Sequence, residues 1–255
     1  MTNPSFSLSG RKALVTGASR GIGEALAVGL AKAGADVAVA ARELSALAAV
    51  ETAITAAGRK SRAIAVDVRD AGAIRGGVDR AVQALGGLDI LVNNAGVEEV
   101  RDSLAVDEAL WDRIVDTNLK GAFFCAQAAA RIMAVAKGGA IINVCSLTSE
   151  VGVPTAVPYG SSKSGLLGMT RALAAEWAAN GIRVNGIGPG YFRTDLTEVF
   201  YQNAEWQQAM LAKIPLRRFG RLEDLVGATV FLCSDAAAYI TGQCLYIDGG
   251  YLASI

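Results

Sequence analysis

Residues 12–23 read K-A-L-V-T-G-A-S-R-G-I-G, and this stretch decides the fold of the chain. The first five residues form a short apolar run typical of a buried strand, and an Ala- and Leu-rich helical pattern follows from residue 24 to residue 33. Glycines at 17, 21 and 23 allow a tight turn that brings backbone N–H groups close to a pyrophosphate, at the positive end of the following helix. A glycine-rich helix entry without a ligand would show the same pattern. Strand, glycine turn and helix together predict the opening of a βαβ unit.

Strand and helix patterns alternate along the rest of the chain. Further strands are predicted at residues 36–41, 62–67, 88–93, 140–145, 182–187 and 243–247. The predicted helices between them include residues 43–57, 106–136, 159–179 and 222–234. Seven such alternations without a linker predict a single domain over residues 1–255. We expect an α/β fold with a doubly wound parallel seven-stranded sheet and helices on both faces.

The composition limits the classes of function. The chain has 255 residues, of which 52% are hydrophobic, and its formal net charge is +0. It contains no histidine, which excludes a Ser-His-Asp triad, a histidine base and a His-ligated metal site, and no metal is expected. Zero net charge argues against nucleic acid or an anionic membrane as the main partner.

The cysteines and the apolar runs indicate where the protein works. Cys125, Cys145, Cys233 and Cys244 are scattered, which is typical of reduced thiols in a cytosolic protein. No uncharged apolar run approaches ~20 residues, and residues 1–12 show no secretory signal. We therefore expect a cytoplasmic protein with a small-molecule substrate.

Tyr159 and Lys163 are four residues apart in a predicted helix and therefore share one face of it. A lysine ammonium close to a phenol favours the phenolate and lowers a pKa that is ordinarily ~10. The pair could thus work as general acid or base near neutral pH, although two exposed residues would also give this spacing. Ser146 lies thirteen residues before Tyr159, directly after the predicted strand 140–145.

The end of the second predicted strand indicates the cofactor. In dinucleotide-binding folds an acid at this place bonds the ribose 2′-hydroxyl and selects NAD. This chain has Arg42 there, and Arg20 lies in the glycine turn. Arginine pairs strongly with phosphate, so NADP(H) is preferred and NAD(H) is the alternative. Solvated surface arginines would give the same sequence.

Polar and small residues at other strand ends suit a cofactor that lies across the edge of the sheet. Asp67 and Val68 could reach an adenine amino group, and N-N-A-G at residues 93–96 ends the next strand. A plain turn would also use Asn and Gly. Asn118 occupies the middle of the predicted helix 106–136, where asparagine has modest propensity. Residues 191–215 are aromatic and irregular, which predicts a lid or a pocket wall.

Taken together, these motifs resemble the short-chain dehydrogenases/reductases of the single-domain type over nearly the whole chain. The motifs are T-G-A-S-R-G-I-G at 16–23, N-N-A-G at 93–96, Asn118, Ser146, Tyr159 with Lys163, P-G at 189–190, and Thr194. The resemblance implies a Rossmann-type fold, a homotetramer, and hydride transfer between nicotinamide C4 and a carbonyl or carbinol carbon.

The resemblance also implies a role for each residue of the site. Tyr159 is the general acid/base, Ser146 binds the same substrate oxygen, and Lys163 binds the nicotinamide ribose and lowers the pKa of Tyr159. Asn118 holds a water that connects Lys163 to solvent. The implied cofactor contacts are Gly17, Ser19, Arg20, Gly21, Ile22, Gly23, Arg42, Asp67, Val68, Asn94, Ala95, Gly96, Tyr159, Lys163, Pro189, Gly190, Phe192 and Thr194. The implied substrate contacts are Ser146, Glu150, Tyr159 and Tyr191.

Within this family, residues 145–150 (C-S-L-T-S-E) and 190–197 (G-Y-F-R-T-D-L-T) are most similar to gluconate 5-dehydrogenases and related sugar or polyol oxidoreductases. Those enzymes carry basic residues shortly after N-N-A-G, whereas this chain has Glu98 and Glu99 before Arg101. Two glutamates would repel a substrate carboxylate unless Arg101 intervenes, so a neutral sugar or polyol, or a cationic substrate, fits as well as an aldonate. Glutamates that point to water would carry no such information.

Two other functions compete with this interpretation. A 3-oxoacyl-carrier-protein reductase uses the same catalytic residues but needs a basic patch for its acidic carrier protein. The chain offers Lys137 there, and residues 178–180 contain no arginine. A cofactor-sensing regulator without catalysis would show a broken set of catalytic residues, and this set is intact.

Overall fold

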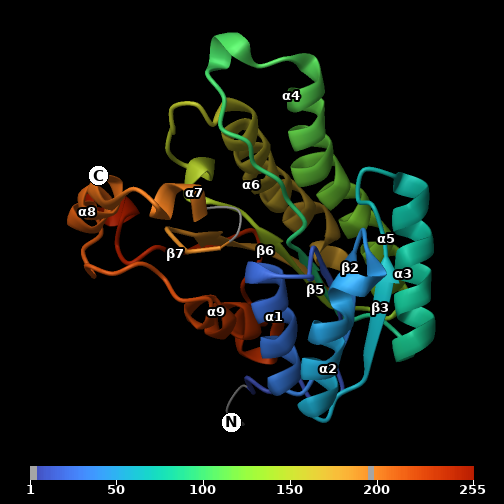
Figure 1. Cartoon of the computed structure of the whole chain (residues 1–255). Helices are drawn as coiled ribbons and strands as arrows, with labels where there is room; N and C mark the ends of the chain where they lie inside the picture. Colours follow the sequence, from blue (N-terminus) through green and yellow to red (C-terminus); the bar gives the residue numbers. More distant parts are fainter. Residues whose placement is uncertain (1–4, 195–197) are drawn as a thin grey trace.

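The computed structural model describes residues 5–194 and 198–255. Within them, seven strands form one parallel sheet in the order β3-β2-β1-β4-β5-β6-β7, as expected (Figure 1). The strands are β1 (Lys12–Thr16), β2 (Asp36–Ala41), β3 (Ser61–Ala65), β4 (Ile90–Asn93), β5 (Gly139–Val144), β6 (Ile182–Pro189) and β7 (Cys244–Ile247). The order is that of a Rossmann-type sheet, in which the winding direction reverses between β1 and β4. Ligands of such sheets bind outside the carboxyl ends of the strands at this reversal.

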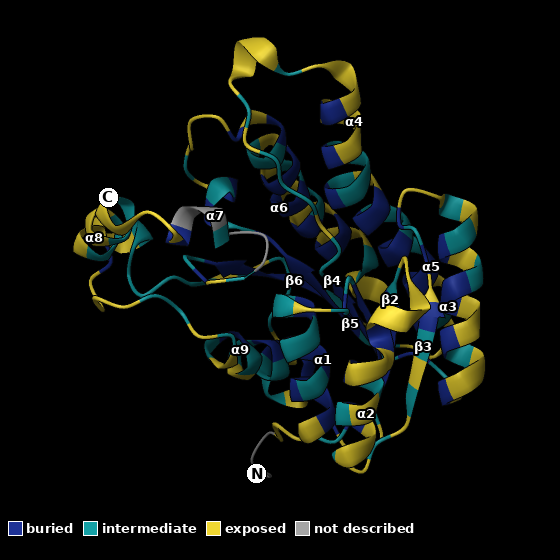
Figure 2. Ribbon diagram, viewed as in Figure 1, coloured by how far each residue is buried: buried dark blue, intermediate teal, exposed yellow. Residues whose placement is uncertain are grey.

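Helices cover both faces of the sheet (Figure 1). They are α1 (Gly21–Lys32), α2 (Ala48–Ala56), α3 (Ala71–Leu85), α4 (Glu108–Val115), α5 (Gly121–Val135), α6 (Val157–Trp177), α7 (Glu198–Tyr201), α8 (Ala204–Lys213) and α9 (Glu223–Cys233). Successive side chains of a strand point to opposite faces, so each strand contributes to the hydrophobic core on both faces of the sheet. Ala13 and Val15 of β1 pack with α1, α2 and α9, whereas Leu14 packs with α3, α5 and α6. Figure 2 shows the buried strands between helices whose outer faces are exposed.

The predicted helix 106–136 is wrong as one continuous helix. The chain forms α4, then a π-helical turn at Asp116–Lys120, and then α5. The Gly121 N–H donates to the carbonyl of Asp116, five residues back. Such widened turns occur often at functional sites, and this one contains Asn118.

Other boundaries differ from the predicted ones by a few residues. Helix α1 begins at Gly21 instead of residue 24, and β3 ends at Ala65, so Asp67 and Val68 lie in the following loop. Pro158 belongs to the first turn of α6, where proline costs nothing because the first N–H groups of a helix have no partner. The predicted irregular segment 191–215 contains α7 and α8, while residues 195–197 lie outside the described residues.

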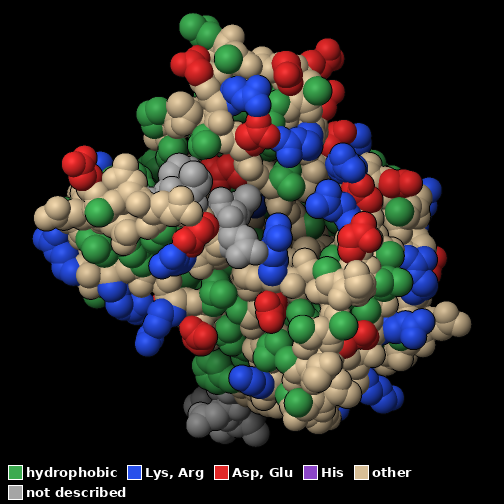
Figure 3. Space-filling model, in the orientation of Figure 1, with side chains coloured by type: hydrophobic (Ala, Val, Ile, Leu, Met, Phe, Trp, Pro, Cys, Tyr) green, Lys and Arg blue, Asp and Glu red, His purple; other side chains and the backbone are tan. Residues whose placement is uncertain are grey.

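The surface carries both signs of charge. Acidic and basic side chains are mixed over the described residues on the face shown in Figure 3. None of the helices in the described ranges is both long and apolar enough to cross a membrane.

Candidate active site

The glycine turn after β1 is shaped by close backbone contacts. Gly17 has a φ of +63°, and a Cβ atom there would lie 2.7 Å from the Cα atom of Ala95. A Cβ atom on Gly23 would lie 2.3 Å from the carbonyl oxygen of Gly17. Neither position accepts a side chain, so the turn stays narrow and its N–H groups stay open to a ligand.

Thr16 and Asn94 fasten this turn to the end of β4. The Thr16 hydroxyl accepts hydrogen bonds from the backbone N–H groups of Asn94 and Ala95, both at 3.1 Å. The side-chain amide of Asn94 donates to the carbonyls of Thr16 at 3.0 Å and Gly17 at 2.9 Å. Both donors of the Asn94 amide are thereby used within the protein. Asn94, predicted as a cofactor contact, therefore holds the two cofactor loops together.

The N-terminus of α1 faces this turn. Arg20 stands at the N-cap in an extended conformation, and its side chain does not cap the helix. The first N–H groups of a helix carry about half a positive charge, which favours phosphate. Thr194 lies over the turn, because a Cβ atom built on Gly21 would be 3.7 Å from the Thr194 Cβ. Ser19 and Ile22, also predicted as contacts, are part of the same turn and are partly buried.

The second predicted phosphate contact lies at the end of β2. Arg42 follows β2 directly and is exposed. Its charge helps to hold the pKa of Asp67 below the ordinary value, although the larger cause is the hydrogen bond from Arg69. The Arg69 guanidinium lies 2.6 Å from the Asp67 carboxylate. Arg42 and Asp67 are thus brought together, while Val68 is buried against Gly121.

Tyr159 and Lys163 project from the first two turns of α6 toward the end of β5. Lys163 is 4% exposed, and its ammonium donates to the Val144 carbonyl at 2.7 Å. The same nitrogen lies 5.6 Å from the centre of the Tyr159 ring. Ser146 begins a short 3-10 turn, in which its hydroxyl accepts from the Thr148 N–H at 3.2 Å, and it is near enough to Tyr159 to lower the pKa of the phenol. Three of the predicted catalytic residues therefore meet at one strand end.

The predicted effect of Lys163 on Tyr159 is wrong for this structure. Burial raises the pKa of Tyr159 above its ordinary value, the charge of Glu98 raises it further, and the hydrogen bond with Ser146 opposes them. Burial also lowers the pKa of the Lys163 ammonium, which is directed to the Val144 carbonyl. Desolvation disfavours both charged forms, and spacing along a helix does not reveal it. The phenol is therefore held in its protonated form, which is the form that can donate a proton.

Asn118 is 1% exposed and clamps the loop after β4. Its Oδ1 accepts from the Val97 N–H at 2.8 Å, and its Nδ2 donates to the Val97 carbonyl at 2.9 Å. Nδ2 also donates to the Ser162 hydroxyl at 3.1 Å, one residue before Lys163. Both N–H donors of Asn118 are used in this way, so the predicted water would have to use another group of the residue. A Cβ atom on Gly96 would lie 3.3 Å from Oδ1, which keeps this loop close to the π turn.

The two glutamates after N-N-A-G have different surroundings. Glu99 is paired with the guanidinium groups of Arg101 and Arg113. Glu98 is half-buried, and among the described residues it has neither a hydrogen bond nor an ion pair. Burial raises its pKa above the ordinary value, and the positive charge of Lys163 opposes this. Glu98 is thus partly shielded from water and near enough to Lys163 for the charges to interact.

Two predicted substrate contacts have partners of their own. The Glu150 carboxylate accepts from the Tyr246 hydroxyl at 3.0 Å and lies 3.9 Å from Arg171. The Tyr191 ring packs edge-on against Trp206 and Tyr251, with centroids 5.8 and 5.2 Å apart.

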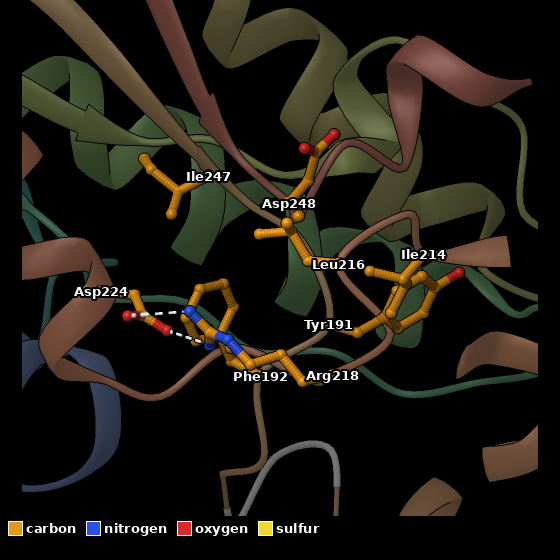
Figure 4. A pocket seen from close by; sticks show the side chains of 10 residues that line it. Tyr191, Phe192, Ile214, Leu216, Arg218, Asp224, Ile247 and Asp248 are labelled. Carbon is orange, nitrogen blue, oxygen red and sulfur yellow. Dashed lines mark hydrogen bonds and ion pairs between the residues drawn. The ribbon is translucent and has the colours of Figure 1, made fainter. Parts of the chain in front are cut away.

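Tyr191 also lines a cavity of about 110 Å³ (Figure 4). In Figure 4 it lies beside Ile214, while the Arg218–Asp224 pair lies next to Phe192. This cavity is separate from the Tyr159–Lys163 pair in its lining residues.

The remaining predicted cofactor contacts follow β6. Gly190 donates its N–H to the Ile247 carbonyl at 2.9 Å, which ties the end of β6 to β7. Phe192 is buried, and its ring occupies the place that a side chain at Gly220 would need. Pro189 ends β6, so Pro189 and Gly190 turn the chain toward Thr194 and the glycine turn.

Sequence reasoning missed several residues that shape the site. The sequence shows that Thr16 is the last residue before the glycine turn, but it does not show the two backbone N–H groups that bond its hydroxyl. Ser162 lies next to Lys163, and only the structure shows its contact with Asn118. The thiols of Cys145 and Cys244 lie on either side of Gly186, where an added Cβ atom would be 3.1 Å from both sulfurs. No sequence signal indicated this pair.

Comparison with known proteins agrees with this geometry. A family model described as Enoyl-(Acyl carrier protein) reductase matches residues 17–252. The chain is 40% identical to gluconate 5-dehydrogenase of Gluconobacter oxydans (strain 621H), over 100% of both chains. It is 43% identical to 3-oxoacyl-[acyl-carrier-protein] reductase of Staphylococcus aureus (strain Mu50 / ATCC 700699), over 94% of this chain and 97% of that one.

Solved structures give the same result. A crystal structure from Sinorhizobium meliloti 1021 has a TM-score of 0.97 and 67% identity and covers 99% of this chain and 100% of its own. A gluconate 5-dehydrogenase from Burkholderia cenocepacia J2315, in complex with NADP and tartrate, has a TM-score of 0.95 and 37% identity over 98% of each chain. The chain belongs to the short-chain dehydrogenase/reductase family and is an NAD(P)-dependent oxidoreductase that acts on CH–OH groups. Within that family it is similar to gluconate 5-dehydrogenases.

Proposed function

We propose that this enzyme transfers a hydride between NADP(H) and a secondary alcohol or ketone of a sugar, a polyol or a sugar acid such as gluconate. The observation that carries the proposal is the half-buried phenol of Tyr159, which lies with Lys163 and Ser146 at the carboxyl end of β5. The glycine turn ends β1 at the same edge of the sheet. A proton donor and a phosphate cradle thus lie on one side of the molecule.

The cofactor preference rests on charge. Arg42 and Arg20 flank the place where the adenosine end of a dinucleotide lies in this fold, and Arg42 is available to a 2′-phosphate. Bidentate arginine–phosphate contacts favour NADP(H), and NAD(H) remains the weaker ligand. Relatives crystallised with NADP support this preference. When bound, the nicotinamide supplies the hydride at C4.

Each residue around the reacting carbon has a separate role in the reaction. In reduction, Tyr159 gives its phenolic proton to the carbonyl oxygen, and in oxidation it takes the proton back. The Ser146 hydroxyl hydrogen-bonds the same oxygen and orients it. Lys163 holds the nicotinamide ribose. Asn118 acts as a positioning residue through Val97 and Ser162.

The experiment compares Tyr159→Phe with Tyr239→Phe. Tyr239 is fully exposed and serves as the matched control. With a panel of sugars, polyols and aldonates and both cofactors, Tyr159→Phe lowers kcat by roughly 10²–10⁴-fold because the proton donor is lost. NADPH binding, followed by fluorescence, is unchanged in both variants. Retention of most activity in Tyr159→Phe would refute the mechanism.

A 3-oxoacyl-carrier-protein reductase is the second candidate, favoured by the 43% identity to the staphylococcal enzyme. Lys137 is exposed after α5, whereas residues 178–180 add no further basic side chain to this end of the molecule. A single lysine is a weak site for an acidic carrier protein. Faster turnover of acetoacetyl thioesters than of every panel member would select this candidate instead.

We also propose a cytoplasmic homotetramer. Side chains of α5 and α6, including Phe123, Leu173 and Trp177, line a surface hollow of about 340 Å³. Apolar helix faces of this kind suit a symmetric contact between copies. The four reduced cysteines suit a reducing compartment. Light scattering at several concentrations measures the mass, and a monomer at micromolar concentration would contradict the assembly.

A further inference from the structure

Glu98 is held between two fixed neighbours. Val97 has both its N–H and its carbonyl bonded to Asn118, at 2.8 and 2.9 Å. Glu99 is paired with Arg101 and Arg113 on the other side. The backbone at Glu98 is therefore fixed by the contacts of its two neighbours.

The loop lies against the helix that carries the reacting groups, because Asn118, which holds Val97, also donates to the Ser162 hydroxyl at 3.1 Å, one residue before Lys163. In agreement with this position, the charge of Glu98 raises the pKa of Tyr159, and the charge of Lys163 lowers the pKa of Glu98. Lys163 is nevertheless bonded to the Val144 carbonyl, and it forms no ion pair with Glu98 in the described structure. A half-buried carboxylate without a partner is costly. The cost is offset if a bound ligand supplies the missing hydrogen-bond donor.

The same loop offers no cation for a negatively charged ligand. Arg101 is the nearest basic residue in sequence, and its guanidinium is engaged by Glu99. Its backbone N–H donates to the Thr155 carbonyl at 2.8 Å, which fixes the end of the loop. The loop next to Tyr159 therefore carries a carboxyl group that has no hydrogen bond or ion pair among the described residues.

We propose that Glu98 determines substrate specificity by accepting a hydrogen bond from a hydroxyl or ammonium group near the reacting carbon, and by excluding a carboxylate from that place. This inference rests on the proposed function and narrows its substrate class. Neutral sugars and polyols meet the requirement. A sugar acid meets it when it reacts at an end remote from its carboxylate, as oxidation of gluconate at C5 would require.

Three ketoses test the inference, because they differ only in the group beside the ketone. D-fructose carries CH₂OH there, 1-amino-1-deoxy-D-fructose carries CH₂NH₃⁺, and 2-keto-D-gluconate carries a carboxylate. Each is titrated against the enzyme–NADP⁺ complex, in which the ketone cannot react, and NADPH formation is followed in parallel to detect any oxidation of the ketose hydroxyl groups. Glu98→Gln keeps the size of the side chain and removes its charge. Glu108→Gln, an exposed residue in the first turn of α4, is the matched control.

The wild-type complex and Glu108→Gln bind the hydroxyl and ammonium ketoses roughly ten- to a hundredfold more tightly than the carboxylate ketose. In Glu98→Gln this ratio falls to about threefold or less, and the preference of the ammonium ketose over the hydroxyl ketose disappears. An unchanged ratio in Glu98→Gln, a wild-type preference for 2-keto-D-gluconate, or no binding of any of the three overturns the inference. The proposed function fails separately, if the wild-type enzyme turns over no member of the sugar, polyol and aldonate panel.

Discussion

Replacing Asn118 by alanine removes the clamp between the π turn, the loop after β4 and helix α6. The asparagine amide makes three hydrogen bonds, two to the backbone of Val97 and one to the Ser162 hydroxyl. Alanine makes none of them and leaves the two polar groups of Val97 to find water. The effect on folding and the effect on activity are therefore expected together.

The magnitude follows from these contacts. Each net hydrogen bond contributes about 0.5–1.5 kcal/mol, so three give about 1.5–4.5 kcal/mol. Because Val97 is only half-buried, hydrogen bonds to water compensate for part of this loss. We therefore expect the free energy of unfolding to fall by about 2–3 kcal/mol. For a chain of this size the melting temperature then falls by about 4–12 °C. A displacement of ~1 Å at the site costs up to about a hundredfold in kcat.

Urea titrations followed by tryptophan fluorescence measure the free energy of unfolding, and initial rates at saturating NADPH measure kcat. Asn180→Ala is the matched control, since Asn180 is exposed at the end of the 3-10 turn after α6. Its effect should stay within about 0.5 kcal/mol, as for most surface substitutions. An Asn118→Ala enzyme with the stability and kcat of the control would refute the clamp.

Three further changes concern Thr16, Glu98 and Arg42. Thr16→Val leaves the N–H groups of Asn94 and Ala95 without their acceptor, so urea titrations should show a loss of about 2–4 kcal/mol that Thr16→Ser avoids. Burial raises the pKa of Glu98 above its unfolded value of 4.5, so the free energy of unfolding should fall as the pH rises from 4.5 through the folded pKa. Glu98→Gln should abolish this fall. Parallel curves of stability against pH for the wild type and the variant would contradict the prediction. Arg42→Ala should weaken NADPH binding roughly ten- to a hundredfold in fluorescence titrations while sparing NADH, and an equal loss for both would contradict a phosphate contact.

The sheet and its order along the chain were predictable because their signals are local. Alternating apolar runs mark buried strands, and the glycine at residue 17 marks a turn with positive φ, which a single stretch of sequence reveals. The spacing of Tyr159 and Lys163 likewise predicted that both lie in one helix, which is α6. What spacing could not give is the state of the phenol, because desolvation by distant segments outweighs the lysine four residues away.

The rest depends on contacts between segments that are far apart in sequence. The π turn at Asp116–Lys120 exists where Asn118 reaches Val97, 21 residues earlier. Whether Glu98 faces water was open in the sequence, because the answer lies in the pairing of its neighbour Glu99 with Arg113, 14 residues later. The contact between Glu150 and Tyr246 was not visible in the sequence, because the two residues are 96 positions apart.

The clamp on Val97 has a consequence for how this enzyme could change its substrate. Asn118 holds the peptide N–H and carbonyl of residue 97, and nineteen of the twenty amino acids supply both groups, proline being the exception. The attachment therefore does not depend on which side chain the position carries. Residue 97 can therefore be varied, proline apart, while Asn118 keeps its bond to Ser162 beside Lys163. A library at this position would test new substrates without removing the clamp.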